Sequence, residues 1–177
     1  KLITHDFSIA IFGKPNTGKS TLLNSFLGFN RFATGLIPGT TSDSVKEYFT
    51  YKNCIIKIID TAGIGKKSKI LNKSINYYSI QKSLQKIAEV GTAIVIIDSL
   101  EGLDRQDKRI INIVSNKAKN IIIIFNKIDL IVKKEKFKKE TLQDIDNTLH
   151  EMKNIKVFFS SAFSKTHVNK ILNYLLE

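Results

Sequence analysis

Short apolar runs, each bounded by glycine or polar residues, recur along this chain at the length of a β-strand. The run at 121–125 contains four isoleucines and a phenylalanine, so we expect a central parallel strand that is covered on both faces. The runs at 45–50 and 54–59 flank a short turn, which predicts an antiparallel hairpin whose first strand lies at a sheet edge. In chain order, the predicted strands are 7–12, 45–50, 54–59, 92–97, 121–125 and 155–159.

Segments with apolar residues at helical spacing separate these strands. Predicted helices cover 75–89 and 104–117, and another begins near 21, with Gly28 expected as its left-handed C-terminal cap. Residues 29–44 and the segment after 64 have no clear period and are predicted as loops. The charged run 133–139 opens a helix with Leu142, Ile145, Leu149 and Met152 on one face, and the last helix carries Val168, Ile171, Leu172, Leu175 and Leu176.

Strands that alternate with helices predict an α/β fold of the P-loop NTPase type. We expect a doubly wound, mostly parallel six-stranded sheet flanked by about five helices. Residues 1–6 are interpreted as a linker, and residues 7–177 as a single domain. In such folds ligands bind beyond the carboxyl ends of the strands, so motifs at those ends are the candidates for chemistry.

The composition favours a cytoplasmic protein. Cys54 has no cysteine partner and lies in a strand-like run, which predicts a reduced core thiol, and no apolar stretch reaches membrane-span length. The net charge of +12 is consistent with RNA contact, but 25 lysines against 3 arginines also fit an AT-rich coding sequence. Because the first residue is Lys1 and the sole methionine is Met152, we expect a piece of a longer protein or a processed one.

The segment 13–20, Gly-Lys-Pro-Asn-Thr-Gly-Lys-Ser, matches the Walker A pattern between a predicted strand and a predicted helix, and we call it the phosphate loop. Gly13 and Gly18 let the backbone approach a ligand closely, and the loop amides and the helix N-terminus then face its phosphates. Lys19 supplies a charge for the terminal phosphates, and the Ser20 hydroxyl can bind Mg²⁺. The residues expected at the nucleotide from this segment are Asn16, Thr17, Gly18, Lys19, Ser20 and Thr21.

Two further motifs lie at predicted strand ends. Asp60 begins Asp-Thr-Ala-Gly, where the carboxylate can hold Mg²⁺ through water and the Gly63 amide can meet a γ-phosphate. Residues 126–129, Asn-Lys-Ile-Asp, are here called the guanine loop, because an ionised Asp129 only accepts hydrogen bonds and suits the N1 and N2 donors of guanine. Within this site, Asn126 can tie the guanine loop to the phosphate loop, Lys127 can cover the base, and Ser161 and Ala162 can place amides near O6.

These motifs together resemble the translation-factor-related GTPases of the TrmE-Era-EngA type over nearly the whole chain. The closer resemblance is to the second GTPase domain of the Der (EngA) family of bacterial tandem GTPases, which act in ribosome assembly. It is carried by residues 38–45, 60–64, 78–87 and 98–107. Ser42, Gly65 and Ile128 depart from the residues that are usual in that family.

The resemblance implies a catalytic set of Asn16, Lys19, Thr41 and Gly63, with Mg²⁺ held by Ser20, Thr41 and Asp60. Thr40 is the alternative to Thr41. Position 64 is isoleucine, which cannot orient water by hydrogen bonding, so intrinsic hydrolysis is expected to be slow. Related proteins hold a K⁺ ion through an asparagine that Asn16 matches; the alternative is that Asn16 only forms a turn.

The function implied is a switch domain that binds GTP, hydrolyses it slowly to GDP, and acts in assembly of the large ribosomal subunit. The implied partners are GTP and GDP, ribosomal RNA or the 50S subunit, and neighbouring GTPase and RNA-binding domains of the same chain, with no membrane. An Era-like or MnmE-like GTPase domain, in small-subunit assembly or tRNA modification, is one alternative. A P-loop small-molecule kinase is another, but it leaves Asn126 and Asp129 unexplained.

Overall fold

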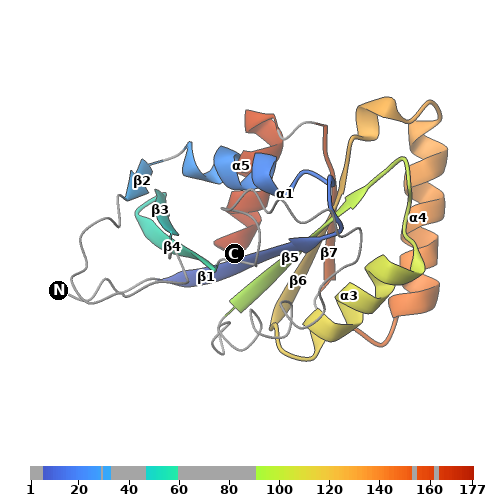
Figure 1. The fold of residues 1–177 in the computed structure, drawn as a ribbon, viewed down its shortest axis with the longest axis horizontal. Helices are drawn as coiled ribbons and strands as arrows, with labels where there is room; N and C mark the ends of the chain where they lie inside the picture. Colours follow the sequence, from blue (N-terminus) through green and yellow to red (C-terminus); the bar gives the residue numbers. More distant parts are fainter. Residues whose placement is uncertain (1–5, 29, 33–46, 60–90, 153–154, 162–163) are drawn as a thin grey trace.

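The computed structural model describes residues 6–28, 30–32, 47–59, 91–152, 155–161 and 164–177. These residues form one seven-stranded sheet in the order β2-β3-β4-β1-β5-β6-β7 (Figure 1). The strands are β1 (Phe7–Gly13), β2 (Asn30–Phe32), β3 (Glu47–Tyr51), β4 (Cys54–Ile59), β5 (Gly91–Asp98), β6 (Asn120–Asn126) and β7 (Ile155–Phe159). Neighbours from β4 to β7 pair in parallel, whereas β2, β3 and β4 pair antiparallel.

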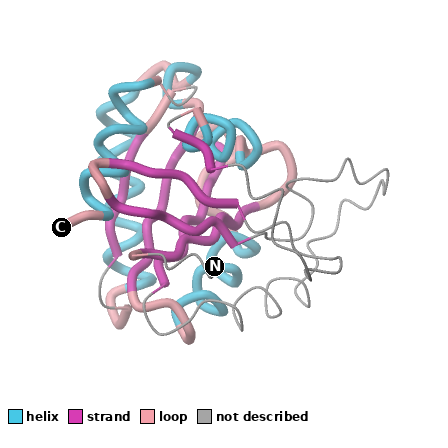
Figure 2. The backbone as a smooth tube through the Cα atoms, turned by 90° about the vertical axis from the view of Figure 1, so that its left-hand side faces the viewer, coloured by secondary structure: helices cyan, strands magenta, loops and turns pink. Residues whose placement is uncertain are grey.

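Helices cover both faces of the sheet, as Figures 1 and 2 show. The described helices are α1 (Lys19–Leu27), α3 (Arg105–Ser115), α4 (Lys134–Leu149) and α5 (Lys165–Leu175), together with a short 3₁₀ helix, η1 (Ile128–Leu130). Because side chains alternate along a strand, Ile9 and Ile11 of β1 pack with α1 and α5. Ala10 and Phe12 point to the other face, where they pack with α3 and α4.

The predicted α/β fold and the mostly parallel sheet are confirmed, with one strand more than expected. The additional strand, β2, lies inside the segment 29–44 that was predicted as a loop. A three-residue strand is too short to show an alternating pattern, and it is held here by backbone pairing with β3. The prediction that the hairpin's first strand lies at an edge is therefore wrong, because β3 lies between β2 and β4.

Gly28 does not form the predicted left-handed cap, since its φ and ψ are −67° and −19°. The backbone continues in a right-handed conformation, and the Gly28 amide donates to the carbonyl of Asn24. This bond satisfies a carbonyl of the last turn without the reversal that a left-handed glycine would produce. The predicted helix at 75–89 lies outside the described residues.

The apolar face of α4 is rotated from the predicted one. Ile145 and Leu149 are buried as expected, but Leu142 is exposed and Thr141 is buried in its place. Residues at 141, 145 and 149 are spaced by four and lie on one side of the helix, and Met152 packs beside them after the helix has ended. None of the helices in the described part of the chain has the length and apolar character that crossing a bilayer requires.

Cys54 is half-buried and not the core thiol that its strand predicted. It is the first residue of β4, directly after the hairpin turn, and the next residue, Ile55, is half-buried as well. Asp6, predicted to belong to a linker, is bound to the sheet: its amide donates to Ile55 O and its carboxylate accepts from Ile55 N, both at 2.8 Å. The remainder of that predicted linker, residues 1–5, lies outside the described residues.

Candidate nucleotide-binding site

An open pocket of about 520 Å³ lies beyond the carboxyl ends of β1 and β6, where a doubly wound sheet places its ligands. The phosphate loop and the guanine loop line the same pocket, although they are more than 100 residues apart in sequence. This placement satisfies the main geometric requirement of the predicted site. The lining residues are Asn16, Gly18, Lys19, Ser20, Thr21, Asn126, Lys127, Asp129 and Leu130.

The phosphate loop has the backbone that its glycines predict. Gly13 has φ +151°, and a Cβ there would lie 2.6 Å from the carbonyl oxygen of Ile96 on the neighbouring strand. Gly18 has φ +113° and immediately precedes α1, whose N-terminus is not capped by a side chain. The amides of the first turn of α1 are therefore not occupied by a cap and are oriented to receive an anion.

Lys19 lies folded against the phosphate loop. Its Nζ donates to Gly13 O at 2.5 Å and to Lys14 O at 2.9 Å. Burial lowers the pKa of this ammonium to about 8, because a desolvated charge is disfavoured. The Thr17 hydroxyl donates to the same Lys14 carbonyl at 3.0 Å and is buried. This carbonyl therefore anchors both the lysine and the turn of the loop.

The guanine loop is attached to the phosphate loop by Asn126. Its Nδ2 donates to Thr17 O at 3.0 Å, as the sequence predicted. After Asn126 the backbone turns at Lys127, which has φ +62°, and η1 then carries Asp129 to the pocket, where it is exposed. The loop is also joined to the chain after β7, because Ile128 N donates to Ser160 O at 3.1 Å.

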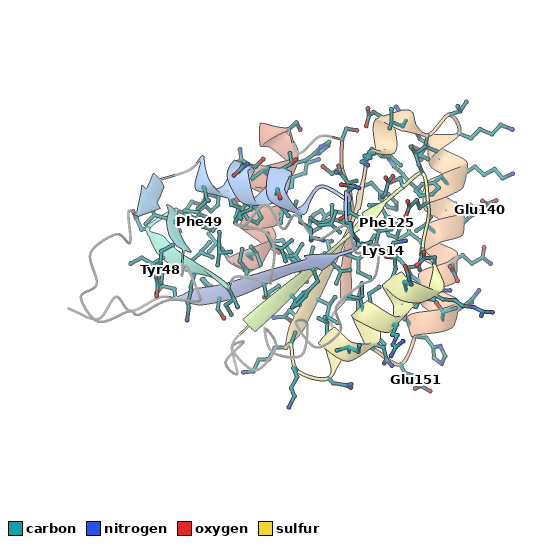
Figure 3. The ribbon with its side chains drawn as sticks, in the orientation of Figure 1. Lys14, Tyr48, Phe49, Phe125, Glu140 and Glu151 are labelled. Carbon is teal, nitrogen blue, oxygen red and sulfur yellow. The ribbon has the colours of Figure 1, made fainter. Side chains whose placement is uncertain are left out.

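A second set of charged groups surrounds the ammonium of Lys14, a residue of the phosphate loop. The ammonium of Lys14, which lies at the end of β1 (Figure 3), is 2.5 Å from Asp104, 3.0 Å from Glu101 and 3.6 Å from Asp107. We call these four residues the Lys14 cluster. Asp104 caps α3 in a reciprocal capping box with Asp107, so the cluster connects the phosphate loop to the start of that helix.

The cluster shifts the pKa values of its members in different directions. Although burial alone lowers the pKa of Lys14, hydrogen bonds to Asp104 and Glu101 raise it overall. For Asp104 the effect of burial has the opposite sign, because burial raises the pKa of a carboxyl group. The hydrogen bond with Lys14 outweighs it and leaves the pKa of Asp104 below its ordinary value. Asp107 is fully buried, and burial raises its pKa to about 6.

The structure accounts for part of the predicted residue set. Of the expected Mg²⁺ ligands, Ser20 is described: it is exposed and lines the pocket, and its hydroxyl oxygen is of the hard type that Mg²⁺ binds. Asn16 lines the pocket with φ +63°. Thr17 is buried, Ser161 is half-buried after β7, and neither is a lining residue. Thr40, Thr41, Asp60, Gly63, Ile64 and Ala162 lie outside the described residues.

Three residues near the pocket were not predicted as site residues. Leu130 lines the pocket from the end of η1, Lys14 connects the phosphate loop to α3, and Asp98 is paired with Lys127. A sequence signal existed for Asp98, which ends a predicted strand next to the one that leads into the guanine loop. Lys14 carried no such signal in a chain with 25 lysines.

Residues 8–127 match the family described as 50S ribosome-binding GTPase. The chain belongs to this GTPase family. The prediction of a GTP-binding, GTP-hydrolysing domain is therefore confirmed, and the kinase alternative is not supported.

The chain is also similar to curated proteins named GTPase Der. It is 39% identical over 170 residues to that of Thermosipho africanus and 38% identical over 170 residues to that of Rickettsia canadensis. These alignments cover 96% and 95% of this chain but 38% of each relative. The chain thus spans less than two fifths of the length of the Der proteins that it resembles.

Solved structures show the same fold. Era from Aquifex aeolicus bound to GDP and aluminium fluoride superposes with a TM-score of 0.63 at 32% identity, covering 98% of this chain and 58% of Era. A structure of Era with a magnesium-bound GTP analogue and a segment of 16S ribosomal RNA matches at 31% identity, also with a TM-score of 0.63, and covers 97% of this chain and 57% of Era. The fold class predicted from the alternating strands and helices is confirmed by these structures.

Proposed function

We propose that this chain is the second GTPase domain of a Der-type protein, which binds GTP and GDP, hydrolyses GTP slowly, and acts in the cytoplasm in assembly of the large ribosomal subunit. The observation that supports it best is that the phosphate loop and Asp129 line the same pocket. At one end of this pocket a nucleotide meets the Lys19 ammonium and the amides of the phosphate loop. At the other end it meets the Asp129 carboxylate. That polarity matches phosphates and a guanine base.

In the proposed binding mode, α1 and the phosphate loop hold the phosphates. In this structure Lys19 donates to two loop carbonyls. In the proposed complex its ammonium donates to the phosphate oxygens instead. Thr17, Gly18, Ser20 and Thr21 contribute through the loop and the first turn of α1. At the other end, Asp129 accepts from the guanine N1 and N2 donors, the Lys127 stem covers the base, and amides at Ser161 and Ala162 approach O6.

The proposed hydrolysis uses Mg²⁺, for which Ser20, Thr41 and Asp60 are the ligands. When bound, the ion neutralises charge on the β- and γ-phosphates. Gly63 is expected to meet the γ-phosphate through its amide, and Ile64 leaves the attacking water without a hydrogen-bonding side chain. Asn16 is the proposed ligand of K⁺, which would stabilise developing charge as an arginine finger does. Equal hydrolysis rates in equimolar K⁺ and Na⁺ would contradict that part of the proposal.

Two similarities and the net charge support the ribosomal role. The family is described as ribosome-binding, and one similar structure of Era is solved with ribosomal RNA. The net charge of +12 is suited to contact with RNA. The 50S subunit, ribosomal RNA, and neighbouring GTPase and RNA-binding domains are accordingly the partners that we propose.

The base assignment is tested by nucleotide competition. The chain and its Asp129→Asn variant are compared for binding of GTP, GDP, ATP and XTP. The variant should lose its preference for GTP and gain affinity for XTP, because the amide donates to the carbonyl at C2 of xanthine. Asp146→Asn, which makes the same charge change at an exposed position of α4, should leave the preference for GTP intact. Tight ATP binding by the unmodified chain would overturn the assignment.

A further inference from the structure

The end of β5 lies beside the guanine loop. Asp98, the last residue of β5, pairs in register with Asn126, the last residue of β6. The two strands are parallel and run side by side in the sheet (Figure 1), so their carboxyl ends reach the same edge. Asp98 does not line the nucleotide pocket, but its side chain reaches a residue that does, Lys127.

Both carboxylate oxygens of Asp98 are used. Oδ1 accepts from the amide of Leu100 at 2.9 Å, which fixes the carboxylate within its own turn. Oδ2 accepts from Lys127 Nζ at 2.6 Å. The Asp98 side chain is 13% exposed and that of Lys127 is 34% exposed, so this ion pair is partly shielded from water. A pre-oriented and partly desolvated carboxylate holds a lysine more firmly than an exposed surface partner does.

Lys127 connects three segments at once. Its ammonium also donates to the backbone carbonyl of Asn16 in the phosphate loop at 3.0 Å. Its backbone has φ +62°, a left-handed conformation that a lysine rarely adopts without support from its surroundings. This residue immediately precedes η1, the turn that carries Asp129 to the pocket.

We propose that Asp98 is a positioning residue for base recognition. By holding the Lys127 ammonium, Asp98 stabilises the left-handed turn from which Asp129 faces the base. Asp98 itself does not touch the nucleotide and acts through Lys127. This inference rests on the proposed function, since it assumes that Asp129 recognises guanine.

The test uses Asp98→Asn, which has nearly the same shape. The Asn oxygen can still accept from Leu100 N, but its NH₂ group now faces the donors of Lys127. We expect the Kd of GDP to rise about tenfold, while the Kd of ADP stays the same, because adenine does not use Asp129. The GDP-over-ADP preference, measured by calorimetric titration, should fall by the same factor. A loss of general structure would instead weaken GDP and ADP alike.

A matched control removes a similar ion pair away from the pocket. Asp144 lies 3.2 Å from Lys108, and their side chains are 40% and 31% exposed. Asp144→Asn makes the same change in net charge, so it reports any long-range electrostatic effect on the phosphates. It should leave the Kd values of GDP and ADP unchanged.

A double-mutant cycle tests the route of action. In a Lys127→Gln background, Asp98→Asn should change the Kd of GDP by less than about twofold, because its partner is already absent. Additive effects, or equal losses of GDP and ADP affinity, would overturn the proposal. Should Asp98→Asn lower the thermal midpoint so far that binding is lost, Asp98→Ser replaces it, since a hydroxyl can still accept from Leu100 N. Absence of a GDP preference in the unmodified chain would instead overturn the proposed function itself.

Discussion

The side-chain amide of Asn126 donates a 3.0 Å hydrogen bond to the backbone carbonyl of Thr17. The two residues are separated by 109 positions, and both are buried, at 4% and 1% exposure. This bond joins the guanine loop to the phosphate loop, which are proposed to hold the base and the phosphates. The distance between the two ends of the nucleotide site is therefore fixed by one short buried contact, in addition to the sheet.

The first prediction concerns this contact. Asn126→Asp preserves the shape of the side chain but places a carboxylate oxygen against the Thr17 carbonyl, so that two acceptors face each other. Losing a buried hydrogen bond and creating this repulsion should weaken GDP binding by about 10- to 100-fold in a calorimetric titration. Asn147→Asp, at an exposed position of α4, makes the same charge change and should bind GDP normally. Equal affinities for the two variants would show that the Asn126–Thr17 bond does not support the site.

The second prediction concerns protonation of Lys19. In the free domain burial lowers the pKa of Lys19 to about 8, and bound phosphates favour the charged ammonium and raise that pKa. Above pH 8, nucleotide binding must therefore take up a proton, and GDP affinity should fall by up to about tenfold for each further pH unit. Titrations at pH 8.5 in two buffers of different ionisation enthalpy should show an uptake of about 0.8 proton per GDP.

Arginine at the same position provides the control for proton uptake. The guanidinium of Lys19→Arg keeps its charge throughout this pH range. This variant should bind GDP more weakly but with no uptake of protons at pH 8.5. The same uptake in the variant would assign the proton to another group.

Much of the site was predictable because its two main loops are contiguous motifs. In the phosphate loop, the motif shows that position 13 is glycine, and the structure adds that a Cβ there would lie 2.6 Å from the Ile96 carbonyl oxygen. The Lys14 cluster and the Asp98–Lys127 pair were not predictable. Lys14 and Asp104 are 90 residues apart, and Asp98 and Lys127 are 29 residues apart. A single lysine also carries little information in a lysine-rich chain. Only the fold brings such groups together.

Errors in the predicted fold have a similar origin. The strand β2 depends on backbone hydrogen bonds to β3. Because every residue has the same backbone groups, such pairing cannot be recognised from the side chains of three residues. Ile145 and Leu149 pack into the core and so fix the rotation of α4 about its axis. In that rotation Thr141 lies on the buried side of the helix and Leu142 does not. Local apolar spacing predicts that a helix has a buried face, but neighbouring elements determine where the edges of that face lie.

The third prediction concerns the turn between β3 and β4. Tyr51 pairs with Cys54, which leaves Lys52 and Asn53 as a two-residue turn with φ +46° and +65°. Both values are typical of a type I′ turn, in which glycine is favoured at the second position. Asn53→Gly should therefore be more stable than Asn53→Ala by about 1–2 kcal/mol in urea unfolding, since alanine is strained in the left-handed region. Equal unfolding free energies would indicate that the turn changes its conformation in solution.

The fourth prediction concerns Asp107, whose Oδ1 is buried without a hydrogen-bond partner among the described residues. Burial outweighs the nearby Lys14 charge and raises the pKa of Asp107 from 3.8 to about 6. Between these pH values the native state holds a proton that the unfolded state has released, so this group's contribution to stability is greatest below pH 3.8 and decreases as pH rises to 6.

The other carboxylates also titrate in this range, so the measurement compares the unmodified chain with Asp107→Asn. From pH 4 to pH 6.5, the unfolding free energy of the unmodified chain should fall relative to that of the variant by about 2 kcal/mol. Asp146→Asn, which makes the same charge change at an exposed position of α4, is the matched control. A difference that increases with pH would mean that attraction to Lys14 exceeds the cost of burying the Asp107 carboxylate. The Lys14 cluster would then stabilise the link between the phosphate loop and α3 at neutral pH, and not weaken it.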